Sequence, residues 1–174
     1  MKSLINFVKM PFKFLEKVSL ADVAFQASGK TLEELFSAAG LAVAATQIKN
    51  YKSIKPKVRK IFRLKGESAE QLLFKFLDEL VFLKDKDLLL FNKFSGMKIK
   101  QEKSGGRGAR GREQRAGSTW RGAGSTFSLK CTAIGEKLDT ERHISLVDVK
   151  AVTMHLFEVR KSGKGWKAKV VLDV

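Results

Sequence analysis

Cysteine, histidine and acidic side chains are scarce in this sequence. Its 174 residues include one cysteine, two histidines and 18 acids against 34 basic residues. A single cysteine excludes an internal disulfide framework, so we expect a reducing, cytoplasmic compartment. Cys131, His143 and His155 do not have the spacing of a zinc site. Because Cys131 follows the alternation of a strand, we interpret it as a small core residue.

Long apolar runs and familiar catalytic motifs are also missing. A membrane-spanning helix needs about 18 consecutive apolar residues, and no such run occurs, so we expect no membrane partner. Residues 1–10 are apolar and basic, but no small-residue cleavage site follows them. We interpret them as an N-terminal extension. The motifs G-x-S-x-G, P-loop and H-E-x-x-H are absent, and nothing supports an independent enzyme.

Positive charge is what the sequence has in excess. The formal net charge of +16 argues for an anionic partner: nucleic acid, an acidic protein or an anionic surface. Residues 51–65 contain seven basic side chains and no acid. This segment predicts either a solvated edge strand, which its lysines protect from pairing, or a surface that faces phosphates.

A Gly/Arg-rich insertion occupies residues 101–126, approximately. Residues 101–127 contain six basic and two acidic side chains, a net +4, and repeat Ala-Gly-Ser-Thr before Trp120 and before Phe127. Such a composition cannot bury enough surface to fold alone, and it is similar to RGG-type segments that bind RNA through charge and stacking. The alternative is a flexible hairpin insertion. The candidate RNA-contact residues are Arg107, Arg110, Arg112, Arg115, Trp120 and Arg121.

Periodicity predicts an α+β fold: a single domain, residues 1–174, with a mixed or mostly antiparallel sheet and two main helices packed on it. Residues 31–34 and 68–71 form capping boxes, each followed by apolar residues at helical spacing. Residues 84–87 and Gly135-Glu136 are predicted turns. The predicted extended segments are 12–28, 51–65, 88–94, 97–100 (after a break at Gly96) and 127–134.

The last 26 residues predict a β-hairpin. Gly163 and Gly165 suit its turn, and the strand that follows alternates so that Asp173 lies on the more polar face. A change of phase before the turn predicts a bulge or bend near Ala151. Asp22 is predicted on the face of an early strand that does not pack under the next helix.

Three motifs together resemble the archease family. They are Ala21-Asp22-Val23, the sequence Lys-Ala-Val-Thr at 150–153 followed by one residue and His155, and the ending at 166–174. Archease is the small activator of the tRNA-splicing RNA ligase, which joins 3′-phosphate or 2′,3′-cyclic-phosphate ends to 5′-hydroxyl ends. The resemblance covers most of the chain. The exceptions are the first residues and the Gly/Arg-rich segment, where the family has a short connection.

The resemblance implies function and site residues. It implies a non-enzymatic protein cofactor that promotes guanylylation and multiple turnover of the ligase in tRNA splicing and RNA repair. In archease the two matching aspartates hold a metal, so it implies a site made of Asp22, Asp173 and the Val174 carboxylate. Ca²⁺ is the expected ion, with Mg²⁺ or Mn²⁺ as alternatives, since oxygen ligands suit hard cations. Lys150 and His155 are the implied partner contacts.

One departure from the family affects this site. The family usually has His-Thr before Ala-Asp-Val, whereas this chain has Ser19-Leu20. Ser19 can replace a hydrogen bond of the histidine but cannot titrate.

Two alternatives to ligase activation stay open from the residues. The first is a basic RNA-binding or RNA-chaperone module that acts through the Gly/Arg-rich segment. The second is a metal-dependent nuclease or phosphatase, which the absence of a convincing general base disfavours.

Overall fold

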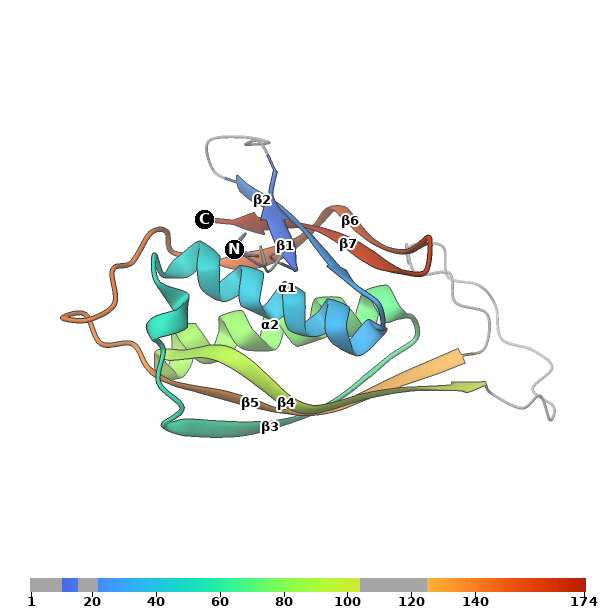
Figure 1. Cartoon of the computed structure of the whole chain (residues 1–174), viewed down its shortest axis with the longest axis horizontal. Coiled ribbons are helices and arrows are strands. Elements are labelled where there is room, and N and C mark those ends of the chain that lie inside the picture. The colour runs from blue at the N-terminus through green and yellow to red at the C-terminus, as the bar shows by residue number, and fades with distance from the viewer. Residues whose placement is uncertain (1–10, 16–21, 104–124) are drawn as a thin grey trace, which may run out of the picture.

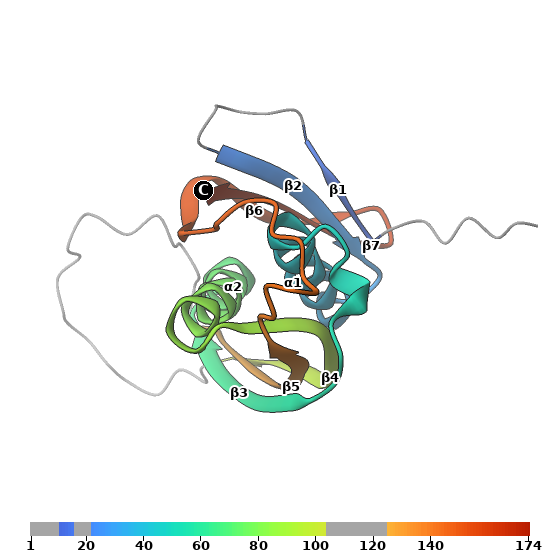
Figure 2. The same ribbon diagram turned by 90° about the vertical axis from the view of Figure 1, so that its left-hand side faces the viewer.

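The computed structural model describes residues 11–15, 22–103 and 125–174, and its two helices lie between two antiparallel sheets (Figures 1 and 2). One sheet has the order β1-β2-β7-β6 and the other β3-β5-β4. The predicted α+β class with antiparallel pairing and two main helices is confirmed, although the strands divide between two sheets. The helices are α1 (Leu32–Gln47), α2 (Ala69–Asp87) and a 3₁₀ turn, η1 (Tyr51–Ser53). The strands are β1 (Phe12–Phe14), β2 (Asp22–Gly29), β3 (Val58–Gly66), β4 (Leu89–Lys103), β5 (Ser125–Lys137), β6 (Ala151–Ser162) and β7 (Gly165–Asp173).

Both helices begin where the capping boxes predict. Thr31 Oγ1 accepts the N–H of Glu34 at 3.2 Å, and Glu34 Oε2 accepts the N–H of Lys30 at 2.7 Å. The equivalent two bonds around Ser68 measure 3.1 and 2.7 Å. The reciprocal bond in each box thus goes to the residue before the N-cap. Each box satisfies two N–H groups at a helix start that would otherwise lack partners.

One core joins the helices to both sheets, and Phe76 of α2 packs among aromatic rings on its second-sheet side. Its ring centroid is 5.9 Å from those of Phe36 in α1 and Phe62 in β3, and 5.3 Å from that of Phe94 in β4. Cys131 is buried as predicted, and this burial raises the pKa of its thiol to about 11. The thiol therefore stays protonated at neutral pH.

Three predicted interruptions differ in the structure. The helix α2 continues through 84–87 and ends at Leu88, which has a left-handed φ of 57°. The strand β4 is continuous past Gly96, whose φ is 60°, and absorbs the irregularity as a register shift between Ser95 and Lys98. The strand β5 passes straight through Gly135-Glu136. In each case pairing or packing extends an element beyond the local signal that predicted a turn or break.

The C-terminal hairpin of β6 and β7 is confirmed, but its irregularity is not near Ala151. The register shifts between Thr153 and Glu158, where Leu156 has a φ of 54°. The change in the alternation of apolar residues therefore does correspond to a bulge, but the bulge lies about four residues further along β6, which is an edge strand. No helix in the described part of the chain is long and apolar enough to cross a membrane.

Candidate functional site

Two aspartates from distant parts of the sequence face each other at one end of the first sheet. Asp22 begins β2, Asp173 ends β7, and the two are register partners. Directly opposite residues on antiparallel strands project from the same face, with Cβ atoms about 4.5–5.5 Å apart. Their neighbours Val23 and Leu172 are also paired and Leu172 is fully buried, so the aspartates belong to the face turned away from the helices. Both are half-buried.

A third strand adds one of the predicted contact residues to this sheet end. Ala151 of β6 is the other register partner of Asp173, and the N–H of Lys150 donates to the Asp173 carbonyl oxygen at 2.9 Å. The Lys150 side chain is exposed. Asp22, Asp173, half-buried Val174 and Lys150 therefore lie together, where the first sheet ends near the label C in Figure 1.

The other predicted contact residue lies elsewhere. His155 is exposed within the irregular part of β6, four residues beyond Ala151, which is roughly 13 Å along a strand. Ser19 and the six candidate RNA-contact residues of the insertion are outside the described residues, as is the extension 1–10. The structure thus brings Lys150 to the carboxylate pair and leaves His155 apart from it.

The carboxylate pair fits a hard divalent cation in its donor chemistry. Like charges directly opposite on neighbouring strands are destabilising, and a cation between them would offset the repulsion. Within the described ranges no three His, Cys, Asp or Glu side chains form a metal-binding group.

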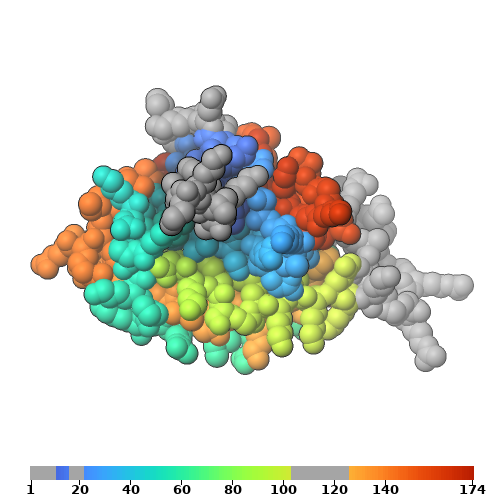
Figure 3. Space-filling model, viewed as in Figure 1, coloured from blue at the N-terminus to red at the C-terminus, as the bar shows by residue number. Residues whose placement is uncertain are grey.

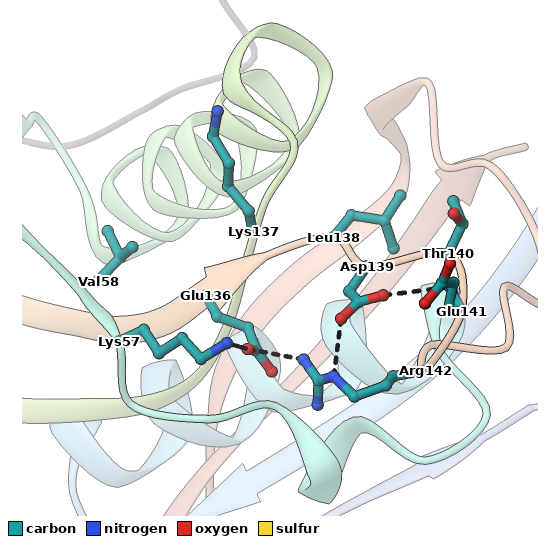
Figure 4. Close-up of a pocket in the computed structure, with 9 residues that line it drawn as sticks. All are labelled: Lys57, Val58, Glu136, Lys137, Leu138, Asp139, Thr140, Glu141 and Arg142. Carbon is teal, nitrogen blue, oxygen red and sulfur yellow. Dashed lines mark hydrogen bonds and ion pairs between the residues drawn. The ribbon is translucent and has the colours of Figure 1, made fainter.

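A second charged cluster, which the sequence analysis missed, surrounds the buried Glu136 (Figure 4). Its Oε2 is 2.8 Å from Arg142 Nη2 and 3.1 Å from Lys57 Nζ. Its Oε1 accepts the N–H of Lys55 at 2.8 Å. The Nε2 atom of His143 is 3.2 Å from the same oxygen, but its direction does not meet hydrogen-bond geometry.

The neighbours of Glu136 keep it ionised. Burial alone would raise its pKa, but Arg142, the Lys55 N–H and Lys57 lower it to about 2. Figure 4 shows Lys57 and Arg142 converging on Glu136, and these three residues help to line an open pocket with a volume of about 520 Å³. Because the carboxylate is already bound on both oxygens, we interpret it as a clamp. It holds the chain after β5, whose projecting part is orange at the left of Figure 3.

The chain matches one known protein family over most of its length. A model of the archease protein family matches residues 12–174. The chain belongs to the archease family. The archease of Methanosarcina barkeri is 34% identical over 154 residues, covering 88% of this chain and 90% of that protein. The archease of Pyrococcus furiosus is 34% identical over 155 residues, with shares of 88% and 93%.

A solved structure supports the same assignment. The solution structure of Methanobacterium thermoautotrophicum protein 1598 matches with a TM-score of 0.68 and 27% identity. The match covers 95% of this chain and 99% of that one. The archease resemblance that was based on a few motifs is therefore confirmed over most of the chain. The aspartates that carried it, Asp22 and Asp173, are the pair that the fold brings together.

Proposed function

We propose that this archease is a non-enzymatic activator of the tRNA-splicing RNA ligase, and that it promotes guanylylation of the ligase and its multiple turnover. The observation that carries the proposal is the direct pairing of Asp22 with Asp173 beside Lys150. This acidic pair has the opposite charge to the chain as a whole, whose net charge is +16. The basic surface of the chain attracts polyanions of any kind, whereas the acidic pair would bind a positively charged site on a partner. The pair would therefore give specificity that the net charge does not.

The proposed site would use a divalent cation, with Ca²⁺ favoured over Mg²⁺ or Mn²⁺. Asp22, Asp173 and the carboxylate of Val174 would hold it, and the bound ion would supply a fixed positive charge at the contact with the ligase. The backbone bond from Lys150 fixes the position of the last residue of β7. The exposed Lys150 and His155 side chains are the proposed contacts with the ligase. They lie far enough apart to touch separate parts of it.

The test is a guanylylation assay with the cognate ligase, GTP and Mn²⁺. Asp22→Ala and Asp173→Ala should each remove stimulation, while the control Asp78→Ala, an exposed position on α2, should keep it. Circular dichroism on each variant separates loss of function from loss of fold. Full stimulation by the double variant would overturn the proposal. Adding residues after Val174 would replace its carboxylate with an amide carbonyl, so a C-terminal tag should weaken stimulation more than a tag before Met1.

An RNA-binding or RNA-chaperone role of the Gly/Arg-rich segment is the second candidate. The composition of residues 101–127, with its net +4, favours it. The same assay separates the two candidates, since an RNA-binding module would leave guanylylation of the ligase unchanged when no RNA is present.

A further inference from the structure

The second sheet has one face on the helices and the other face turned outward (Figure 2). Phe62, Leu129 and Phe91 are buried on the inner face. Register pairing identifies the outward positions, because partners across antiparallel strands share a face. Four rows of outward positions run from the row of Arg59 and Lys93 to the row of Lys65 and Lys100. Together they carry seven exposed basic side chains and no exposed acid. They are Arg59, Arg63 and Lys65 on β3, Lys130 on β5, and Lys93, Lys98 and Lys100 on β4. We call this set the basic sheet face.

The cations of the basic sheet face form rows across the three strands. Lys130 is opposite Arg63 on one side and Lys98 on the other, so three like charges stand in one line. The next row has Ser128 between Lys65 and Lys100. Strands are about 4.8 Å apart, and alternate residues on one strand are about 6.7 Å apart. Neighbouring cations in the rows of Lys130 and Ser128 are therefore about 5–10 Å apart, whereas the row of Ile61, Thr132 and Ser95 has no cation and separates them from Arg59 and Lys93.

This arrangement does not stabilise the fold. Like charges directly opposite each other are destabilising, and none of the seven side chains makes an ion pair with another described residue. Glu102 is one row beyond Lys100, and Glu136 at the opposite end is already bound by Lys57 and Arg142. The row of Arg63, Lys130 and Lys98 thus lacks internal compensation, which a bound polyanion would supply.

We propose that the basic sheet face binds the phosphate backbone of single-stranded RNA without reading its sequence. Interfaces with nucleic acid are polar and strongly positive, and about half or more of their hydrogen bonds go to phosphate and sugar. Between the cations, Thr132, Ser95 and Ser128 offer hydroxyl groups that can donate to phosphate oxygens. Among the described residues the face has no aromatic side chain on which a base could stack, so binding would rest on contacts to phosphate and sugar, which carry no sequence information.

The composition of the face argues against two other occupants. Ile61 is the only exposed large apolar residue on it, whereas a membrane-binding surface needs apolar side chains that enter the lipid. The centre of a protein interface is depleted in charge and enriched in aromatic residues, the reverse of this face. The preference for RNA over DNA rests on the proposed function, because an activator of an RNA ligase works where RNA ends are joined.

The test measures RNA binding by the full chain with no ligase present, so its failure is distinct from failure of ligase activation. The probe is a fluorescently labelled, unstructured RNA of about 16 nucleotides, the upper site size of single-strand grooves. The variant changes the middle row: Arg63→Gln, Lys130→Gln and Lys98→Gln. The control removes three exposed cations elsewhere: Lys30→Gln, Lys52→Gln and Lys164→Gln. Both variants have the same reduction in net charge.

We expect the middle-row variant to bind at least about tenfold more weakly than the control at low salt. Its plot of log affinity against log salt should be shallower by about 2, since each phosphate that a cation neutralises on a single strand contributes roughly 0.7. Equal reductions of affinity in the two variants would overturn the proposal, because they would show only an effect of net charge. The proposal also fails if Arg107→Gln, Arg110→Gln and Arg112→Gln together remove binding while the middle-row variant keeps it. If the middle-row variant loses more affinity for polyglutamate, anionic vesicles or single-stranded DNA than it loses for RNA, the surface binds that partner instead.

Discussion

Asp22 of β2 is the direct register partner of Asp173 of β7, so two carboxylates share one face at the end of a sheet. We expect Asp173→Asn to lower the affinity for Ca²⁺ by at least about tenfold. In chelator the same variant should be more stable than the wild type, by about 0.2–1 kcal/mol, because the opposed like charges are removed. Added Ca²⁺ should raise the Tm of the wild type more than that of the variant at the same Ca²⁺ concentration. Calorimetric titration and thermal denaturation measure these effects.

The matched control for this pair is Asp78→Asn, which removes an exposed acid from α2 and should change neither quantity. Repeating the titration with Mg²⁺ and Mn²⁺ ranks the ions. If wild type and Asp173→Asn bind all three ions equally, the pair is not a metal site.

Glu136 should make this protein sensitive to acid. Its pKa in the folded protein is about 2, against an ordinary value of 4.5. Its stabilising effect is therefore complete above about pH 4.5 and is lost as the pH falls toward 2, a difference of about 3 kcal/mol. Glu136→Gln should cost about 1.5–3 kcal/mol at neutral pH, because it removes the charge to which Arg142 and Lys57 bind, while both cations keep access to solvent. Urea denaturation at several pH values measures both effects.

The exposed neighbour Glu141 is the control for this measurement. Glu141→Gln should stay close to the wild type at every pH, since a surface carboxylate contributes little. An equal response of the two variants would remove Glu136 from its assigned role as a clamp.

Gly135 should tolerate no side chain. An added Cβ would lie 1.7 Å from the carbonyl oxygen of Leu90 on the neighbouring strand, a contact that only backbone movement can relieve. We expect Gly135→Ala to cost at least about 3 kcal/mol, the upper part of the usual range for overpacking. Gly163→Asn is the contrasting variant: its φ is 60°, its Cβ would meet nothing within 4 Å, and asparagine adopts this conformation readily. Denaturation midpoints of the two variants should differ clearly, and similar midpoints would contradict the assignment.

Local signals predicted the elements of this fold better than their ends or their partners. The capping residues Thr31 and Ser68 fix both helix starts, because a side-chain cap acts within four residues. Alternation placed Asp22 and Asp173 on polar strand faces, because the face of a strand residue also depends only on its near neighbours in the sequence. The division into two sheets could not be predicted, since alternation gives the face of a strand but not its neighbour.

The two clusters missed by sequence reasoning depend on long-range pairing. Gly135-Glu136 is a turn signal locally, yet β5 continues because β3 and β4 pair on both sides of it. Likewise the basic residues of 51–65 gave only three of the seven cations of the basic sheet face. The rest, such as Lys98 and Lys130, became visible only when the register brought three strands together.

The same register shows how the Gly/Arg-rich segment can be removed. Lys103 at the end of β4 and Ser125 at the start of β5 are direct partners, so two turn residues can join them. We expect replacement of residues 104–124 by Asn-Gly to give a folded protein, because this pair suits the tight type I′ turn of a two-residue hairpin. Its Tm should lie within a few degrees of the wild type, since each doubling of loop length changes the closure free energy by only about 0.6 kcal/mol. Circular dichroism and thermal denaturation measure this.

The shortened protein also separates the functions proposed for the chain. If the carboxylate pair activates the ligase, guanylylation should be stimulated as strongly as by the wild type, because Asp22 and Asp173 lie on the other sheet. RNA affinity should fall and its salt dependence should flatten by roughly 0.7 for each phosphate that the protein no longer binds, while the part due to the basic sheet face remains. Replacing the segment with a glycine-serine linker of equal length is the control for chain length. A folded, shortened protein that no longer stimulates the ligase would instead place residues 104–124 in the activation step. The ligase would then have to contact both this segment, which joins β4 to β5, and the carboxylate pair on the first sheet.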